Sequence, residues 1–411
     1  MQDESNTLPL SSIKVADFGQ YVAGPYCAAI LGTFGADVVR IEPPSGGTDR
    51  TLVPLTADQD GDGALFRQMN QGKRSVALSI ADHKARPVLR KILKWADIVV
   101  ANLPPKALDH FGLSADQVAA ANPNAILVTC SAYEPVGPRA DLVGFDGIGQ
   151  ALSGAMAMTG EEGVPRKAYV HYVDFCTAAI SACGAAMALI QRDKTGNGEH
   201  VSASLLRTAL SMMNSTLMEE AVLAPGRTGE ANRAQQAAPA DVFRTSDGWV
   251  LFQAAGDAMF ARWANLIGHP EVIDDERFQT DISRGNHRDF LCGLMQDWCS
   301  SRTADACVAA LAGARLPAAK VQSPQSALQD RSFKTAGWFV QTPVGEGRHA
   351  PVATPPVAFA SGLAALSPAR SLGADTQAFL RELGCSSGDI DALVERGVAC
   401  CGVDDSMSLS G

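Results

Sequence analysis

The chain has 411 residues, of which 46% are hydrophobic and 19% charged, and its formal net charge is -10 at pH 7. These values are typical of a globular protein with more than one domain, and they exclude disordered and fibrous proteins. Because the balance is acidic and no dense cluster of Lys or Arg occurs, we expect no nucleic-acid partner.

The cysteines bear on metal binding, and the opening residues and apolar runs bear on where in the cell the protein is found. Ten cysteines form neither a CxxC pair nor a Cys/His cluster with zinc spacing, so we expect no metal site. The opening MQDESNT lacks the basic and apolar regions of an export signal, so we expect a cytoplasmic protein. No apolar run is predicted to reach the roughly 18 to 20 residues of a membrane span, and we expect no membrane partner.

The first predicted unit is a βαβ unit over residues 13–42. A short apolar strand precedes a helix that begins near Gly24-Pro25 and ends at Gly35, and VVRIE then resumes an extended run. A βαβ unit of this kind joins parallel strands. The turn lacks G-x-G-x-x-G and no P-loop occurs in the chain, so NAD and ATP are poorly supported as cofactors.

Three further segments are predicted to extend this sheet. Residues 66–80 place Lys73 and Arg74 just before a strand, where two cations could meet a phosphate or simply be solvated. Residues 96–105, ADIVVANLPP, form a buried strand that ends near Asn102. Residues 122–138 repeat the pattern. Ligands bind at the carboxyl ends of strands in open α/β sheets, so Asn102 is expected at a ligand-binding edge.

The stretch from Lys167 to Gln191, KAYVHYVDFCTAAISACGAAMALIQ, is predicted to carry the chemistry. A short extended segment gives way at Asp174 to a helix dense in Ala, Ser and Gly. At this position the Asp174 carboxylate would accept a hydrogen bond from the first helical turn, and the helix dipole would favour its ionised form. A plain N-cap is the competing interpretation of this residue.

The composition and the predicted elements change in the second half of the chain. A long apolar helix is predicted over residues 201–223, followed by a Gly/Pro/Gln/Ala-rich linker that ends at residue 239. Residues 240–320 are predicted to form a small α+β domain that opens with a hairpin turning at Asp247-Gly248. A second Pro/Gly-rich passage then leads to a helical tail.

These segments, in this order, resemble the class III CoA transferases, the family typified by formyl-CoA transferase and carnitine CoA transferase. The matching pieces are residues 15–42, 70–78, 96–113, 122–133 and 144–160, the Asp174 helix, residues 280–289 and the helical tail. The resemblance spans nearly the whole chain.

The resemblance implies an α/β fold with a large Rossmann-like domain, a parallel sheet and a smaller inserted α+β domain, in an interlocked homodimer. The regions it implies are 1–200 for the N-terminal part of the large CoA-binding domain, 201–239 for the connecting helix and linker, 240–320 for the small domain, and 321–411 for the return linker and the C-terminal part of the large domain.

The resemblance also implies a CoA transferase whose nucleophile is Asp174. A carboxylate that attacks an acyl-CoA thioester gives a mixed anhydride and CoA thiolate, and the thiolate then forms an aspartyl-CoA thioester. An incoming carboxylic acid reverses these steps. The partners are therefore an acyl-CoA donor and a carboxylic acid acceptor. This chemistry requires no permanently bound cofactor and no metal, because the coenzyme A thioester is the substrate.

By similarity, several positions are expected to contact CoA. They are Val22, Ala23, Arg40, Lys73, Leu78, Asn102, Leu103, Pro104, His110, Gly144 and Phe145. His110 replaces an arginine of the formyl-CoA enzyme, and Val22 replaces a glutamine, which puts formate and oxalate in doubt as natural acids. The segment 253–260, QAAGDAMF, has one glycine where that enzyme has a glycine-rich loop.

Two alternative functions stay open. α-Methylacyl-CoA racemase shares the fold, but it has a proton-transferring histidine where this chain has Phe145, and His171 is the nearest substitute. A protein that binds a CoA thioester without turnover is the other alternative. The acids are not readable from the sequence, although Arg139, Arg166 or Lys167 could pair with the second carboxylate of succinate, mesaconate or itaconate.

Overall fold

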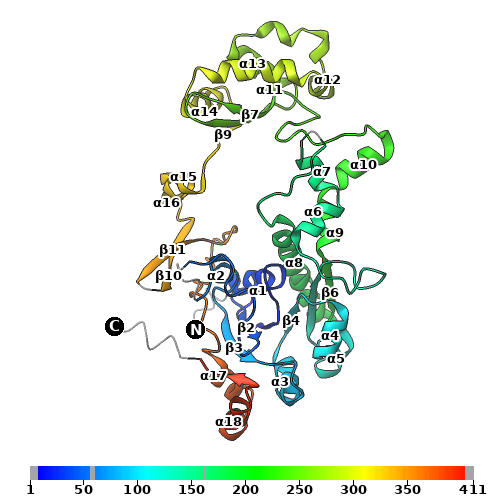
Figure 1. The fold of residues 1–411 in the computed structure, drawn as a ribbon, viewed down its shortest axis with the longest axis vertical. Coiled ribbons are helices and arrows are strands. Elements are labelled where there is room, and N and C mark those ends of the chain that lie inside the picture. The colour runs from blue at the N-terminus through cyan, green and yellow to red at the C-terminus, as the bar shows by residue number, and fades with distance from the viewer. Residues whose placement is uncertain (1–7, 56–60, 162, 346, 403–411) are drawn as a thin grey trace. The chain divides into compact units, whose positions relative to one another are not determined.

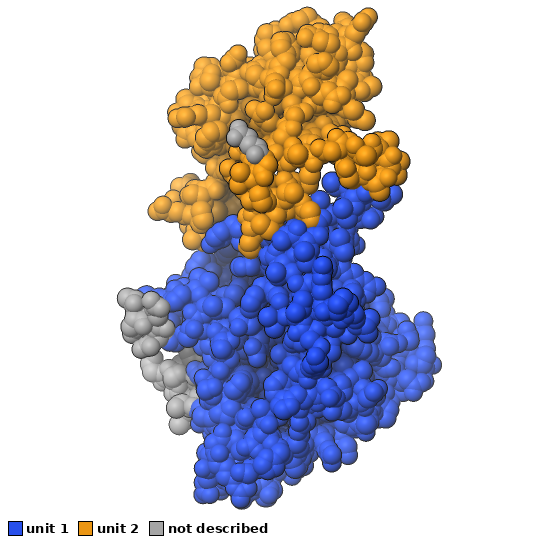
Figure 2. All heavy atoms as spheres, turned by 45° about the vertical axis from the view of Figure 1, so that its right-hand side comes forward, with its two compact units in different colours: residues 1–153, 168–218, 338–411 blue, residues 154–167, 219–337 orange. Residues whose placement is uncertain are grey.

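The computed structural model describes residues 8–55, 61–161, 163–345 and 347–402 (Figure 1). The opening MQDESNT, on which the expectation about export depends, lies outside the described residues. The chain divides into two compact units (Figure 2). The first unit comprises Met1–Ser153, Ala168–Met218 and Trp338–Gly411, and the second comprises Gly154–Lys167 and Glu219–Gly337.

A seven-stranded sheet forms the centre of the first unit, in the order β12-β3-β2-β1-β4-β5-β6. The strands are β1 (Lys14–Asp17), β2 (Asp37–Glu42), β3 (Arg74–Leu78), β4 (Ile98–Ala101), β5 (Ile126–Ser131), β6 (His200–Ser204) and β12 (Ala399–Cys400). β1 to β6 pair in parallel, and β12 pairs antiparallel with β3. This confirms the predicted α/β class, and the strand order 3-2-1-4-5-6 is that of doubly wound nucleotide-binding sheets.

Helices cover both faces of this sheet. They are α1 (Ala23–Thr33), α2 (Ala64–Met69), α3 (Arg86–Trp95), α4 (Pro105–Phe111), α5 (Ala115–Ala121), α6 (Asp146–Leu152), α8 (Tyr172–Thr195), α9 (Leu205–Met212), α17 (Thr376–Glu382) and α18 (Ser387–Glu395). α1 and α8 bury the face that carries Val15 and Val128. α3, α5, α17 and α18 bury the face that carries Ala16 and Leu127. Both faces are buried, so the strands are nearly continuous apolar runs.

Helix α8 corrects the prediction that no apolar run reaches the length of a membrane span. It has 24 residues and a mean hydropathy of 1.8 over its most apolar window, and half of that window is buried inside the protein. The helix packs on α1, β5 and β6. Gly184 lets β6 approach closely, because a Cβ at this position would lie 2.7 Å from Val201 Cγ1. In this fold α8 is a core helix of the first unit.

Two local predictions around α8 were wrong. The helix that was predicted to begin at Asp174 begins two residues earlier, at Tyr172, and the segment before it forms no strand among the described residues. The predicted helix over 201–223 also fails at its start, since His200–Ser204 is the parallel strand β6. Ser204 ends the strand and caps α9, accepting a hydrogen bond from Arg207 N at 3.2 Å. α9 then ends at Met212, and α10 (Asn214–Leu223) follows.

The second unit contains a three-stranded antiparallel sheet, β7 (Ala240–Arg244), β8 (Trp249–Gln253) and β9 (Ala318–Lys320). The predicted hairpin is present, because Thr245 N donates to Gly248 O across the turn. The helices of this unit are α7 (Ala155–Thr159), α11 (Asp257–Ile267), α12 (Asp281–Asn286), α13 (Arg288–Ser300), α14 (Ala304–Gly313), α15 (Pro324–Gln329) and α16 (Arg331–Thr335). A hairpin of β10 (Phe339–Gly345) and β11 (Arg348–Ala353) belongs to the first unit.

The segment Gly154–Lys167 groups with the second unit, although the sequence placed it within the large domain. Glu161 forms an isolated antiparallel bridge with Glu230, and Ala231 N donates to Gly160 O at 2.9 Å. These backbone contacts between distant parts of the chain hold the segment there. The predicted domain limits themselves stay predictions.

Candidate active site

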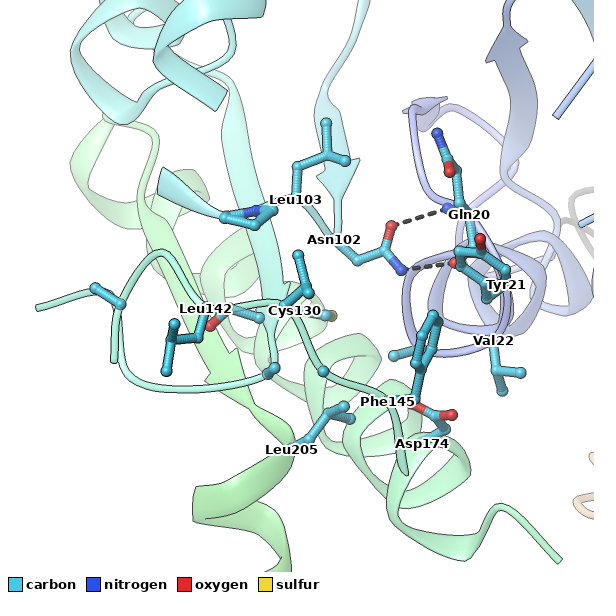
Figure 3. A pocket seen from close by; sticks show the side chains of 17 residues that line it. Gln20, Tyr21, Val22, Asn102, Leu103, Cys130, Leu142, Phe145, Asp174 and Leu205 are labelled. Atoms are coloured by element: carbon cyan, nitrogen blue, oxygen red, sulfur yellow. Dashed lines mark hydrogen bonds between the residues drawn. The ribbon is translucent and has the colours of Figure 1, made fainter. Parts of the chain in front are cut away.

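A pocket of about 170 Å³ opens at the carboxyl ends of β1, β4 and β5 (Figure 3). Its walls come from residues 20–23 after β1, 102–104 after β4, 130–132 around the end of β5, and 142–145 before α6. β1 and β4 are the neighbours at which the strand order reverses, and ligands of doubly wound sheets bind at that point. The pocket therefore lies where the sequence placed a ligand.

The turns after β1 and β4 are joined by a reciprocal pair of hydrogen bonds. Gln20 N donates to Asn102 Oδ1 at 2.8 Å, and Asn102 Nδ2 donates to Gln20 O at 2.6 Å (Figure 3). The next residue, Tyr21, has a φ of 65°, which is unusual for a side chain of this size. Its N–H donates to Asp49 Oδ2 at 3.0 Å, and its ring meets the Phe145 ring edge-on at 5.1 Å. This strained turn forms one wall of the pocket.

Asp174 lies on the pocket as the third residue of α8, and it is 8% exposed. Its own N–H donates to Asp146 Oδ2 at 3.2 Å. The plain N-cap interpretation of Asp174 is wrong, because His171 occupies the N-cap position and Asp174 lies inside the first turn. A hydrogen bond from that turn to the Asp174 carboxylate stays a prediction.

The pocket lining is mainly apolar. Among the described residues that line it, Asp174 is the one carboxylate, and no Lys, Arg or His is present. Cys130 also lines it, but burial raises the pKa of this thiol to about 11, against a smaller opposing effect of its hydrogen bond with Ser181. Cys130 is therefore a neutral thiol near pH 7 and a poor nucleophile. Asp174 is the group in the pocket best suited to nucleophilic attack.

The predicted site residues divide into two groups. The pocket brings together Asp174, Val22, Ala23, Asn102, Leu103, Pro104, Gly144 and Phe145. The remaining four do not line it. Leu78 is buried in the core on β3, and the exposed His110 lies on α4, where its carbonyl accepts a hydrogen bond from Arg86. Their contacts with CoA stay predictions.

Arg40 and Lys73 are buried in ion pairs, so neither presents a free charge to a phosphate. Arg40 Nη2 donates to Asp49 Oδ1 at 2.8 Å, with both side chains 2% exposed. Lys73 Nζ donates to Asp17 Oδ2 at 2.7 Å. Burial lowers the pKa of Lys73, although the Asp17 charge opposes this shift. Arg40 is linked to the pocket wall indirectly, because its partner Asp49 also accepts a hydrogen bond from Tyr21 N. The contacts of Arg40 and Lys73 with CoA stay predictions.

Other candidates from the sequence lie outside the pocket lining. His171, the proposed substitute in a racemase, is exposed at the N-cap of α8. Arg166 pairs with Glu161 at 3.4 Å within the second unit. Among the described residues, no group of three or more His, Cys, Asp or Glu side chains could hold a metal ion.

A comparison of the sequence with models of known protein families shows which family the chain belongs to. Residues 10–376 match the family described as CoA-transferase family III. The chain is a member of CoA-transferase family III. It is an enzyme family whose members transfer CoA, which agrees with a carboxylate in a pocket at the switch point of an α/β sheet.

Individual members of CoA-transferase family III resemble the chain over most of its length. Succinyl-CoA:D-citramalate CoA-transferase of Chloroflexus aurantiacus is 29% identical, with 81% of this chain and 83% of that protein covered. Succinate–glutarate CoA-transferase of Agrobacterium fabrum is 31% identical, with 68% and 72% covered. The crystal structure of a CAIB/BAIF family protein from Brucella suis superposes with a TM-score of 0.78 at 29% identity, covering 92% of this chain and 100% of that chain.

Sequence reasoning missed Asp146 and Gln150. Both are buried on α6, and Gln150 donates to Asp146. Their spacing of four residues in GFDGIGQ puts them on one face of a helix, which was a readable signal. The signal did not reveal their partners, because Asp146 contacts residues on α8 that are 27 and 28 positions away.

Proposed function

We propose that this member of CoA-transferase family III moves CoA from an acyl-CoA thioester to a free carboxylic acid, with Asp174 as the nucleophile. The observation that carries the proposal is the position of Asp174, the one carboxylate among the described residues that line this apolar pocket at the switch point of the sheet. Val22, Ala23, Asn102, Leu103, Pro104, Gly144 and Phe145 would then line the path of the CoA thioester.

The reaction begins when an Asp174 oxygen attacks the thioester carbonyl. The C–S bond breaks, CoA leaves as a thiolate, and Asp174 becomes one half of a mixed anhydride. The thiolate then attacks the Asp174 carbonyl carbon, releasing the donor acid as a carboxylate and leaving an aspartyl-CoA thioester. The acceptor carboxylate attacks this thioester, and the same two steps run in reverse. No net oxidant, reductant or proton is consumed.

The apolar lining gives this sequence a chemical advantage. Both covalent intermediates react readily with water, so turnover requires a site from which bulk water is largely excluded. Tyr21, Val22, Leu103 and Phe145 supply such a lining around Asp174. In a racemase the corresponding requirement is a pair of proton-transfer groups, and Phe145 cannot act as one of them.

We also propose that the enzyme is a homodimer with interlocked chains. α8 leaves Ile180, Met187 and Ile190 about half exposed, at 54%, 55% and 49%. A separate apolar groove of about 780 Å³ is lined by α1, α8, the β10–β11 hairpin and residues 353–368. Apolar surface of this extent supports burial against a second copy. Analytical ultracentrifugation would test this, and a monomer at micromolar concentration would contradict it.

Chemical trapping tests the proposed function. The protein is incubated with succinyl-CoA, acetyl-CoA or mesaconyl-CoA and then treated with hydroxylamine, and its peptides are analysed by mass spectrometry. A transferase forms a hydroxamate at Asp174, and Asp174→Ala forms none. A racemase instead exchanges deuterium from the solvent into the acyl α-carbon, and a binding protein without turnover does neither.

A further inference from the structure

The buried residue Asp146 receives the N–H groups at the start of α8. It is the first residue of α6, and it is 0% exposed. Its Oδ2 accepts hydrogen bonds from Val173 N at 2.8 Å and from Asp174 N at 3.2 Å. N–H groups in the first turn of a helix have no partner within that helix. Asp146 therefore caps, from a different helix, the turn that carries the nucleophile.

The second oxygen of Asp146 is held by a directional chain of hydrogen bonds. Ala168 N donates to Gln150 Oε1 at 2.9 Å, and Gln150 Nε2 donates to Asp146 Oδ1. Each partner of Asp146 is thus a donor, so both of its oxygens must accept. An ionised carboxylate satisfies this pattern, whereas an amide would place an NH₂ group against one of the donors.

Close packing makes the α6–α8 junction stiff. A Cβ at Gly149 would lie 2.9 Å from Val173 Cγ1 and 3.1 Å from Leu205 O. Gly149 lies one turn after Asp146 and packs against Val173 in the first turn of α8, so a shift of that turn relative to the Asp146 carboxylate would disturb this close contact. Among the described residues, His171, the N-cap of α8, makes no side-chain hydrogen bond to that turn.

We propose that Asp146 is a positioning residue for the transfer reaction and acts through Asp174. The proposal rests on the proposed role of Asp174 as the nucleophile. The Asp174 side chain projects from the capped first turn of α8, so the direction of its carboxylate depends on how that turn is held. A reacting group that is misplaced by about 1 Å costs about 10²-fold in rate. Loss of the Asp146 carboxylate should therefore slow the chemical steps more than it weakens acyl-CoA binding.

Three variants test this role. Asp146→Asn keeps the side-chain volume but places an NH₂ group against one of the donors, and Gln150→Ala removes one of the three hydrogen bonds to Asp146. Asp375→Asn is the matched control, because Asp375 also accepts a backbone N–H from a distant segment, Ser75 N at 2.8 Å, and does not line the pocket. The donor is whichever of succinyl-CoA or acetyl-CoA the wild type turns over. The measurements are kcat, KM, the rate of hydroxylamine trapping at Asp174, and thermal unfolding by circular dichroism.

For Asp146→Asn we expect kcat and the trapping rate to fall together by about 10- to 100-fold, while KM for the donor stays within about threefold. Gln150→Ala should show the same pattern with a smaller loss, of about threefold to tenfold. Asp375→Asn should lower the unfolding temperature while kcat per folded molecule stays within about twofold of the wild type.

The proposal is overturned if folded Asp146→Asn retains wild-type kcat and trapping, or if its loss only matches the loss of folded protein. If Asp146→Asn does not fold, the test rests on Gln150→Ala, and an unchanged kcat in that variant overturns the proposal. Failure of the proposed function looks different, because in that case the wild type itself forms no hydroxamate at Asp174.

Discussion

Replacing Asp49 by alanine should destabilise the protein far more than breaking a similar ion pair on the surface. Asp49 accepts two hydrogen bonds from Arg40 Nη2, at 2.8 and 3.1 Å, and a third from Tyr21 N at 3.0 Å. Arg40 and Asp49 are both 2% exposed. Asp49→Ala would leave the buried Arg40 guanidinium without its hydrogen-bonded carboxylate, and its one remaining ion pair among the described residues would be the longer one of Arg40 Nε with Glu42 Oε1, at 3.6 Å. Breaking a buried pair in this way costs about 3–5 kcal/mol.

A matched surface pair provides the control. Arg74 makes a similar two-point contact with Asp37, at 3.0 and 2.7 Å, but these side chains are 28% and 43% exposed. Solvent screens this pair, so Asp37→Ala should cost about 0.2–1 kcal/mol. Urea unfolding followed by circular dichroism measures both variants. Equal losses for Asp49→Ala and Asp37→Ala would refute the reasoning, because burial would then make no difference.

The double variant Arg40→Met/Asp49→Leu measures how much of the stability loss in Asp49→Ala comes from the Arg40 charge that it leaves behind. Removing Arg40 and Asp49 eliminates these two charges together, and Glu42 keeps its ion pair with Arg50 at 2.8 Å, so most of the loss seen in Asp49→Ala should be recovered. The Tyr21 turn would still lack its acceptor. We therefore expect the double variant to regain stability while its KM for acyl-CoA stays above that of the wild type. A double variant that is no more stable than Asp49→Ala would contradict this.

Three further predictions concern single side chains. Gly149→Ala should lower kcat and the unfolding temperature, because its Cβ would lie 2.9 Å from Val173; unchanged values in both assays would count against the tight α6–α8 junction. Burial raises the pKa of Glu42, but its hydrogen bond with Arg50, the charges of Arg40 and Arg50 and the Gly47 N–H together outweigh burial and lower the pKa. Glu42 thus stabilises the fold above its unfolded pKa of about 4.3 and loses this contribution as the pH falls through the lower folded pKa, so urea unfolding of Glu42→Gln should show a deficit that shrinks in acid. Cys130, with its pKa of about 11, should resist iodoacetamide near pH 8 in peptide mass spectra, and rapid labelling would show that the thiol is not buried as described.

The sheet and the walls of the pocket were largely predictable from the sequence. The βαβ unit over residues 13–42, the strand before Asn102 and the strand at 122–133 have local apolar patterns flanked by Gly, Pro or Asn. Parallel strands place their carboxyl ends at one edge of a sheet, so these segments had to meet there. The hairpin at Asp247-Gly248 was readable for the same reason, since its turn is local.

The remaining features depend on contacts that no local pattern records. Lys73 was a candidate for a phosphate contact because it precedes a strand, and Arg40 was named as a CoA contact by resemblance alone, but each has a buried acidic partner elsewhere in the chain. The cap of α8 comes from Asp146, 28 residues before Asp174. β6 was taken for the start of a helix, because its apolar residues precede a true helix without a Gly or Pro to separate them.

Transfer of oxygen through Asp174 tests the central claim most directly. In the proposed cycle one oxygen of the acceptor acid remains on Asp174, and the next donor acid leaves with an oxygen taken from Asp174. The enzyme is therefore turned over with an ¹⁸O-labelled acceptor acid in unlabelled water. We predict ¹⁸O in the peptide that contains Asp174 and in the donor acid released next. Full exchange activity with no ¹⁸O in that peptide or in the released acid would contradict the account.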